Sequence, residues 1–468
     1  MKIQKIQFNQ NKILGDLELD FTNRLTGLPH DTILLVGENG VGKTTILTEI
    51  SNFLSGGALS VHFRKMEYCI DGDNGMVKIN IIPEGNDVYS FIREKDGHEE
   101  RLKYGWDQNR SSGHNLDSMN NDEDDPRHYG SLLSLPRSIF NTKPINNVGV
   151  SELDINIHEK DTENDFTSFK QLLVDLNSLD AEDFTEQHRN GSQISIDDFD
   201  QGSRMSRFTH AFNDFFDTMR YSCIKGENGQ KEIYFSKYGN EIPIDSLSTG
   251  EKQIVFRGIF LLRNLNRLKG GILLIDEPEL SLHPKWQNKI LKYYQTLFTD
   301  PVTGLMQVQI IMATHSERIL STAFDNPTKN GVIVLKNDGG TITSSLVNAP
   351  GVLPSVTSAE TTYLAYDVPT IDYHIELFSY IQRLNATILG ELNVKETDDY
   401  IQGHAAYDST IHARLDSFTN PKTNHTTNYA TLPTFVRNRI DHPSPTDSYN
   451  TEQLKMSIEL MRNIIMHP

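Results

Sequence analysis

The segment GENGVGKT, residues 37–44, has the residue types and spacing of a phosphate-binding loop. It matches G-x-x-x-x-G-K-[ST] and lies between a run of aliphatic residues and the predicted start of a helix. Its glycines let backbone N–H groups surround phosphate oxygens, Lys43 can reach the β- and γ-phosphates, and Thr44 can ligate Mg²⁺. A chance glycine-rich turn is the alternative, which the strand–turn–helix context disfavours. The residues predicted to contact a nucleotide here are Gly37, Asn39, Gly40, Gly42, Lys43, Thr44 and Thr45.

A second segment, GGILLIDEPELSLHP (residues 270–284), places two carboxylates at the end of an aliphatic run. Such a run is typical of a buried central strand, which delivers side chains at its C-terminal edge. Asp276 would hold Mg²⁺, and Glu277 would activate the attacking water as a general base. Two acids that merely end a strand are the alternative. Beside a phosphate-binding loop, however, the pair predicts hydrolysis of a nucleoside triphosphate.

The segment LSTGEKQ, residues 247–253, allows two compatible interpretations. Ser248 and Glu251 have the spacing of a capping box that opens a helix. The same helix N-terminus also favours an anion, so Ser248, Gly250 and Glu251 are candidate nucleotide contacts. His315, in IIMATHSERIL, follows another predicted strand, where an imidazole can contact a γ-phosphate. A single histidine there is usually structural, so the functional interpretation depends on the neighbouring motifs.

In this order, GENGVGKTT, LSTGE, LLIDEPELSLHP and MATHS resemble the motifs of ATP-binding cassette (ABC) ATPases, specifically the soluble branch with the structural-maintenance, Rad-fifty-like and OLD-family proteins. The resemblance covers roughly residues 1–350, with LSTGE where transporters typically carry LSGGQ. It implies ATP and Mg²⁺ as ligands and a head-to-tail dimer in which Ser248 and Gly250 reach the γ-phosphate bound by the other chain. It also implies that His315 is the switch histidine. The family's glutamine loop has no convincing match, and Arg137 is only a weak substitute.

Hydrophobic periodicity predicts an α/β fold built on a mixed sheet. Residues 1–21 alternate apolar and polar side chains, as two antiparallel half-buried strands would. From about residue 232 the order strand, helix, strand, helix, strand implies parallel strands with crossover helices. The polar, acidic residues 106–130 predict a mobile surface loop. Because sustained heptads are missing, the insertion is expected to be compact rather than a long coiled coil.

We therefore expect an ABC-type P-loop ATPase with an insertion and a further small domain. The last domain is expected to be all-α, because Leu454, Ile458, Met461 and Ile465 fall on one helical face. The predicted segments are an ATPase N-lobe with the P-loop at 1–105, an insertion with mobile acidic loops and helices at 106–231, an ATPase C-lobe with the signature, Walker B strand and switch histidine at 232–350, and a helical C-terminal domain at 360–468.

Composition limits the partners and the compartment. The net charge is −19, so contact with DNA would require a local basic patch. Two cysteines, Cys69 and Cys223, are too few for a disulfide framework, and we expect both to be small buried residues in a reducing compartment. No window is long and apolar enough to span a bilayer, and the N-terminus lacks the apolar block of a signal peptide. These features favour a cytoplasmic protein without a membrane partner over a transporter.

The residues after 350 lack the strand-borne Glu and Asp-x-Asp pattern of the Toprim nuclease that OLD-family proteins carry. The segments YDVPTIDYHIELFSYIQRL and TLPTFVRNRIDHPSP instead resemble the ATPase subunits of Septu anti-phage defence systems, a type also associated with retrons. This resemblance implies a separate HNH nuclease partner controlled by ATP occupancy, and assembly beyond a dimer. The chain would then be the sensor and scaffold subunit.

The segment RNRIDH offers an alternative function. Arg437, Asn438 and His442 match the R-N-x-x-x-H pattern of HEPN ribonucleases. A histidine of near-neutral pKa could take a 2′-hydroxyl proton, and an arginine could stabilise the developing charge. In the structural alternative, Arg437 and His442 only fasten the last helix. The sequence thus leaves two classes open, a scaffold for a nuclease and a ribonuclease restrained by its own ATPase.

Overall fold

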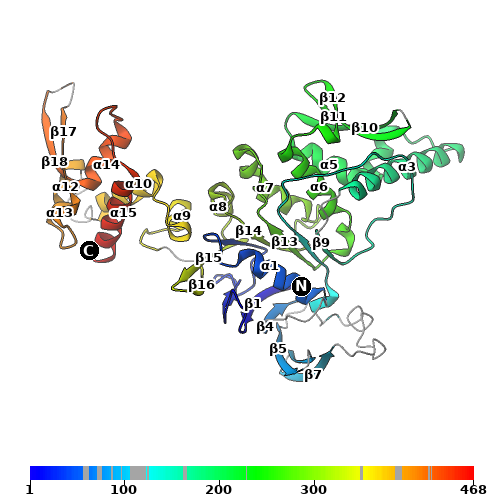
Figure 1. Ribbon diagram of the computed structural model, residues 1–468, viewed down its shortest axis with the longest axis horizontal. Coiled ribbons are helices and arrows are strands. Elements are labelled where there is room, and N and C mark those ends of the chain that lie inside the picture. Colours follow the sequence, from blue (N-terminus) through cyan, green and yellow to red (C-terminus); the bar gives the residue numbers. More distant parts are fainter. Residues whose placement is uncertain are drawn as a thin grey trace. The chain divides into compact units, whose positions relative to one another are not determined.

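The computed structural model divides the chain into two compact units, Met1–Leu346 and Val347–Pro468, each described here by itself (Figure 1). Most of the acidic loop predicted at 106–130 lies outside the described residues. The residues that the structure describes are 1–55, 63–70, 76–85, 88–95, 97–105, 123, 126–161, 166–227, 229–347, 351–384, 393–419, 422 and 424–468.

A mixed seven-stranded sheet forms the centre of the first unit, in the order β16-β15-β3-β14-β13-β8-β9. Neighbouring strands in this sheet are parallel, except for the antiparallel pair β15 and β16. The register places Leu35, Ala313 and Asp276 level with one another on β3, β14 and β13. The loops after these strands therefore leave the sheet at the same edge. The strands are β3 (Thr32–Val36), β8 (Ser131–Ser134), β9 (His158–Lys160), β13 (Ile272–Asp276), β14 (Gln309–Ala313), β15 (Asn330–Asp338) and β16 (Thr341–Leu346).

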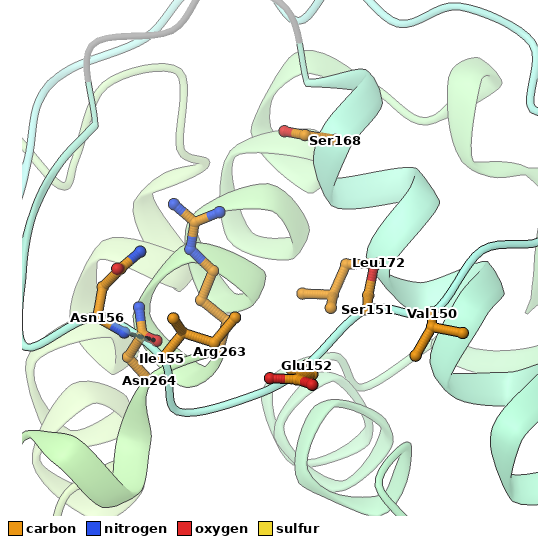
Figure 2. A pocket seen from close by; sticks show the side chains of 9 residues that line it. All are labelled: Val150, Ser151, Glu152, Ile155, Asn156, Ser168, Leu172, Arg263 and Asn264. Carbon is orange, nitrogen blue, oxygen red and sulfur yellow. Dashed lines mark hydrogen bonds between the residues drawn. The ribbon is translucent and has the colours of Figure 1, made fainter.

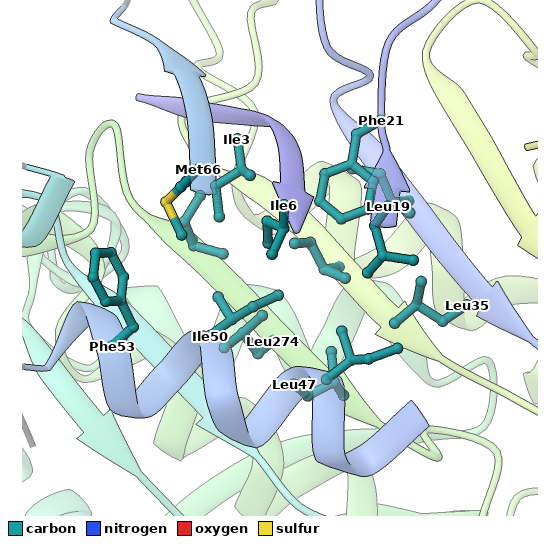
Figure 3. Packing of buried hydrophobic residues seen from close by; sticks show 14 of the residues in the cluster. Ile3, Ile6, Leu19, Phe21, Leu35, Leu47, Ile50, Phe53, Met66 and Leu274 are labelled. Carbon is teal, nitrogen blue, oxygen red and sulfur yellow. The ribbon is translucent and has the colours of Figure 1, made fainter. Parts of the chain in front are cut away.

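A second, antiparallel sheet has the order β2-β1-β4-β5-β6-β7. The predicted antiparallel pair at 1–21 is confirmed by β1 and β2. Helix α1 (Lys43–Leu54) turns Leu47, Ile50 and Phe53 into a buried cluster shared by both sheets (Figure 3). This burial of an apolar helix face holds α1 against the sheets. The strands are β1 (Lys2–Phe8), β2 (Glu18–Asp20), β4 (Phe63–Cys69), β5 (Met76–Gly85), β6 (Val88–Lys95) and β7 (His98–Gly105).

Helices and a small three-stranded sheet lie between β9 and β13 in the chain. One expectation is wrong here: the strand predicted after residue 232 is β11, which pairs antiparallel with β10 and β12. The connections between these strands are short turns that cannot hold the crossover helix of a parallel pair. The elements are α3 (Thr167–Arg189), α4 (Ile196–Gly202), α5 (Ser206–Phe215), β10 (Met219–Glu227), β11 (Gln230–Lys237), β12 (Asn240–Pro243) and α6 (Thr249–Leu262).

Two further helices of this unit are α7 (Pro284–Leu297) and α8 (Glu317–Ala323), which follow β13 and β14. The described part of the unit also has short 3-10 turns at η1 (Pro126–His128), η2 (Ile244–Ser246) and η3 (Leu265–Arg267). Among the described residues Cys69 and Cys223 form no disulfide, and both are only half-buried, so the expectation that they are buried is wrong for both. Among the described residues, no helix combines the length and apolarity needed to cross a bilayer.

The second unit is mainly helical, as predicted, and its core includes the expected face of α15. It also contains a two-stranded antiparallel hairpin, β17 and β18, that the expectation of an all-α domain missed. Most β17 side chains are exposed, so the apolar alternation that announces a strand is weak there. The elements are α9 (Ser358–Tyr366), α10 (Ile371–Leu384), α12 (Val394–Gly403), α13 (Ser409–His412), β17 (Ala413–Thr419), β18 (Thr426–Thr431), α14 (Leu432–Asp441) and α15 (Thr451–Met466).

Candidate nucleotide site

The predicted phosphate-binding loop joins β3 to α1. Gly37 has φ +147°, and a Cβ there would lie 2.3 Å from the carbonyl oxygen of Leu335 on β15, so only glycine fits. Gly42 is the N-cap residue of α1, and among the described residues no side chain caps this helix. Its first N–H groups are thus not taken by a side-chain acceptor. Asn39 and Gly40 are exposed in the turn between, and Thr45 follows in the first turn of α1. The loop therefore fits an anion.

Lys43 is held inside this loop. Its Nζ donates hydrogen bonds to the carbonyl oxygens of Gly37 and Glu38, each at 2.8 Å. Burial lowers the pKa of Lys43 to about 8, and the carboxylates of Glu277 and Asp276 act in the opposite direction. A buried ammonium whose partners are neutral carbonyls would gain strongly from a phosphate, which supplies the missing negative charge.

The side chains of Thr44 and Asp276 are in contact, as two ligands of the same Mg²⁺ ion would be. The Thr44 hydroxyl donates to Oδ2 of Asp276 at 2.8 Å. Oδ1 of Asp276 is buried and has no hydrogen-bond partner among the described residues. Burial also raises the pKa of Asp276, which the hydrogen bond from Thr44 opposes. An unpartnered carboxylate oxygen beside a hydroxyl supplies the oxygen donors that Mg²⁺ prefers, so these residues fit that ion.

Glu277 and His315 face each other across the end of the sheet. Glu277 has φ +41°, a left-handed conformation that is unusual for a non-glycine residue. Its Oε1 lies 3.7 Å from Nε2 of His315, and both side chains are partly exposed. Burial and the charge of Lys43 lower the pKa of His315, while Glu277 opposes them. His315 is therefore mainly neutral at pH 7. Because the Glu277 side chain is partly exposed, a water molecule can contact its carboxylate.

The predicted capping box is present at the start of α6. The Ser248 side chain accepts from the Glu251 N–H, and the Glu251 carboxylate accepts from the Ser248 N–H. Glu251 also pairs with Lys237 of β11 at 2.6 Å. A Cβ on Gly250 would lie 2.6 Å from the carbonyl oxygen of Ser281. These contacts connect the segment to β11 and to the loop after β13, whereas the phosphate-binding loop, both acids and His315 lie together.

Three further charged side chains lie in the segments around this site, one named as a weak candidate from the sequence and two not named there. Arg137, the weak substitute for the glutamine loop, is paired with Asp161, both of them on segments flanking β8 and β9. Arg257, buried on α6, donates to the backbone carbonyl of Asp276 at 3.2 Å. Glu279 accepts the His315 N–H at 2.5 Å. A lone charge in the apolar run QIVFRGIFLL could have pointed to Arg257.

In the second unit, the residues of the alternative ribonuclease site have local partners. Arg437 pairs with Asp441 at 2.7 Å on the same helix. Asn438 is buried and its Nδ2 donates to Asp416 of β17 at 3.1 Å. The exposed His442 stacks on the Phe418 ring with a centroid distance of 5.1 Å. The contacts of Asn438 and His442 join α14 to the hairpin and not to α15, the last helix, so both functions considered for this segment stay predictions.

A pocket of about 380 Å³ lies between the inserted region and the end of α6 (Figure 2). Its one arginine, Arg263, is already paired with Glu159 through Nε at 2.9 Å and stacks on Phe169. The positive charge is thus committed within the protein. The residues that line the pocket are Val150, Ser151, Glu152, Ile155, Asn156, Ser168, Leu172, Arg263 and Asn264.

A family model described as "AAA domain, putative AbiEii toxin, Type IV TA system" matches residues 33–321, more than half of the chain. The chain belongs to this family. It is an ABC-type ATPase, and the α/β fold and the resemblance to that class are confirmed. Nucleotide binding follows from the same match, whereas the individual residues assigned to ATP and Mg²⁺ stay predictions.

Among named relatives, this family member is 26% identical over 329 residues to the Septu protein PtuA of Bacillus thuringiensis, covering 67% of this chain and 71% of that protein. A PtuA protein of Bacillus mycoides is 23% identical, covering 72% of this chain and 41% of that one. The "Retron Ec83 probable ATPase" of Escherichia coli is 28% identical, covering 38% of this chain and 34% of that one. A solved Smc head bound to a ScpA domain aligns at 14% identity with a TM-score of 0.43, covering 74% of this chain and 98% of that one.

Proposed function

We propose that this ATPase is the sensor and scaffold subunit of a bacterial anti-phage defence complex and that it controls a separate HNH nuclease. The observation that carries the proposal is the similarity to PtuA, which spans about two thirds of both chains. The similarity to retron ATPases supports the same assignment. On this proposal the second unit is a docking surface for the nuclease.

The site residues divide the hydrolytic work among them. Lys43 binds the β- and γ-phosphates of the substrate through its buried ammonium group, which gains a negatively charged partner in the phosphates. Thr44 and Asp276 would hold Mg²⁺, which supplies charge neutralisation at the phosphates. Glu277 takes the proton of the attacking water as a general base. His315, neutral at pH 7, can hydrogen-bond the γ-phosphate or the water from the opposite side.

A second copy of the chain completes the site on this proposal. Ser248 and Gly250 lie at a helix N-terminus whose described contacts are with β11 and Ser281, not with the phosphate-binding loop of the same chain. A helix N-terminus favours a phosphate, so these residues can serve the nucleotide of the partner in a head-to-tail dimer. The segment contacts Ser281 in the loop after Glu277. Closure of the dimer would therefore affect the residues that each of the two chains contributes to the hydrolytic site. Assembly beyond a dimer is compatible with this arrangement.

The test measures phage survival and nuclease output together. Cells express the chain with a candidate HNH nuclease, as wild type, Glu277→Gln or Lys43→Ala, and are challenged with phage. We expect only the wild-type chain to protect the cells against phage. We also expect the nuclease to co-purify with the chain. Protection that survives Lys43→Ala would refute control by ATP.

The purified chain alone, with and without ATP, tests the alternative. We expect no cleavage of RNA or DNA by the wild type, and His442→Ala to behave like it apart from stability. RNA cleavage by the wild type that His442→Ala abolishes would overturn the scaffold proposal. It would make the second unit a ribonuclease restrained by the ATPase unit.

A further inference from the structure

Glu279 connects two of the loops that meet at the nucleotide site. It lies three residues after Asp276, in the loop that leaves β13, and its Oε2 atom is buried. Its Oε1 accepts the backbone N–H of His315 at 2.5 Å, in the loop that leaves β14. Burial raises the pKa of Glu279, and hydrogen bonds from the His315 N–H and the Thr314 hydroxyl act against this. The carboxyl group thus lies where a charge is costly, and it accepts hydrogen bonds both from its own backbone N–H and from the segment at Thr314 and His315.

The contact controls where the His315 ring can lie. On one side of His315, the Thr314 N–H donates to the carbonyl oxygen of Leu35 at 3.1 Å. On the other side, the Ser316 hydroxyl donates to Gln287 at 2.8 Å. The N–H of His315 itself is held by Glu279. Without that acceptor, a partly buried donor loses its partner, and we expect the backbone at His315 to shift between its two held neighbours, which would move the imidazole relative to Glu277.

We propose that Glu279 is a positioning residue that sets the His315 imidazole against Glu277 and the γ-phosphate. The inference rests on the role proposed for His315. Glu279 belongs to the loop that also carries the general base, so one carboxyl group fixes the spacing between the base and the histidine. Displacement of a reacting group by about 1 Å can lower the rate about a hundredfold. A gain of this size outweighs the cost of burying the Glu279 carboxyl group.

Steady-state ATPase assays and ATP-binding titrations on the full chain test this inference. Glu279→Ala should lower kcat about tenfold to a hundredfold and leave the Kd for ATP within about threefold, since Lys43 and the P-loop are unchanged. Glu279→Gln keeps a carbonyl acceptor for the His315 N–H and an amide that can meet Thr314. It should retain kcat within about threefold. The glutamine variant also keeps the test valid if the alanine variant is unstable.

A double-mutant cycle with His315→Ala separates this inference from the role of His315. If Glu279 acts through the imidazole, Glu279→Ala should lower kcat in the wild type but not further in His315→Ala. Additive losses would overturn the inference while leaving His315 essential. A wild-type kcat in His315→Ala would instead overturn the role proposed for His315.

Glu360 provides the matched control. It is a buried carboxylate of the second unit that accepts the backbone N–H groups of Gly351 and Val352 at 3.1 and 2.8 Å. Glu360→Ala should lower the midpoint of thermal unfolding and leave kcat unchanged. If both alanine variants reduce kcat in proportion to their loss of stability, Glu279 has no positioning role.

Discussion

His374 should make the stability of the second unit depend on pH. Its side chain is fully buried on α10, with Nε2 2.9 Å from the hydroxyl of Ser457. Nδ1 is buried and has no hydrogen-bond partner among the described residues. Burial lowers the pKa of His374 from 6.5 to about 3. The folded unit therefore keeps this imidazole neutral at a pH where the unfolded chain has already protonated it.

The sign and size of the effect follow from these two pKa values. Between pH 6.5 and 3 the unfolded chain binds the extra proton, so the free energy of unfolding falls as the pH falls. At pH 5 the difference of 1.5 units from the unfolded pKa corresponds to a loss of about 2 kcal/mol relative to pH 7.5. His374→Gln, which cannot take up the proton, should lack this loss.

Urea unfolding at pH 7.5 and pH 5, followed by circular dichroism, measures the effect as the difference between the wild type and His374→Gln. Subtracting the variant removes the contribution of carboxylates that titrate near pH 5. Ser457→Ala is the control: it removes the hydrogen bond and lowers stability at both pH values, but keeps the titrating group. Equal pH dependence in the wild type and His374→Gln would refute the argument.

Three further outcomes are expected. Gly37→Ala should weaken ATP binding at least about tenfold, since its Cβ would meet the Leu335 carbonyl at 2.3 Å; fluorescence titration with a nucleotide analogue checks this, and unchanged affinity would contradict it. Asp276→Asn should leave Mg²⁺-independent nucleotide binding and abolish the stimulation of hydrolysis by Mg²⁺, measured as kcat against Mg²⁺ concentration; retained stimulation would exclude this aspartate as a ligand. Asp398→Ala should destabilise the second unit by about 2–4 kcal/mol in urea unfolding, because its buried carboxylate accepts two N–H groups and the Thr431 hydroxyl; a loss below about 1 kcal/mol would contradict this.

Local chemistry made part of the molecule predictable from the sequence. The phosphate-binding loop and the capping box at Ser248 are encoded by residues close together in the chain, and the structure has both. Strand pairing is not encoded in this way. The segment at β11 looked like one more parallel strand, although its short turns commit it to a hairpin. The hairpin of the second unit was missed because β17 buries little apolar surface.

The role of Glu279 could not be predicted for a related reason. Its partner, the N–H of His315, is 36 residues away, and every residue except proline has such a donor. Only the register of β13 against β14 brings the two together. Asp276 and Glu277 were recognisable because a carboxylate pair after an aliphatic run is itself a rare pattern. A carboxylate that serves a backbone amide leaves no comparable trace in the sequence.

The level register of three strands explains why the site works as one unit. Leu35, Asp276 and Ala313 lie side by side, so the loops that follow leave the sheet together. Backbone hydrogen bonds then join them, from Glu277 N–H to Ala313 and from Thr314 N–H to Leu35. A phosphate bound after β3 would therefore lie close to the proposed general base after β13 and to the histidine after β14. Occupancy of the nucleotide site can thus be read at the same sheet edge that carries out hydrolysis, and a slow ATPase can still act as a switch.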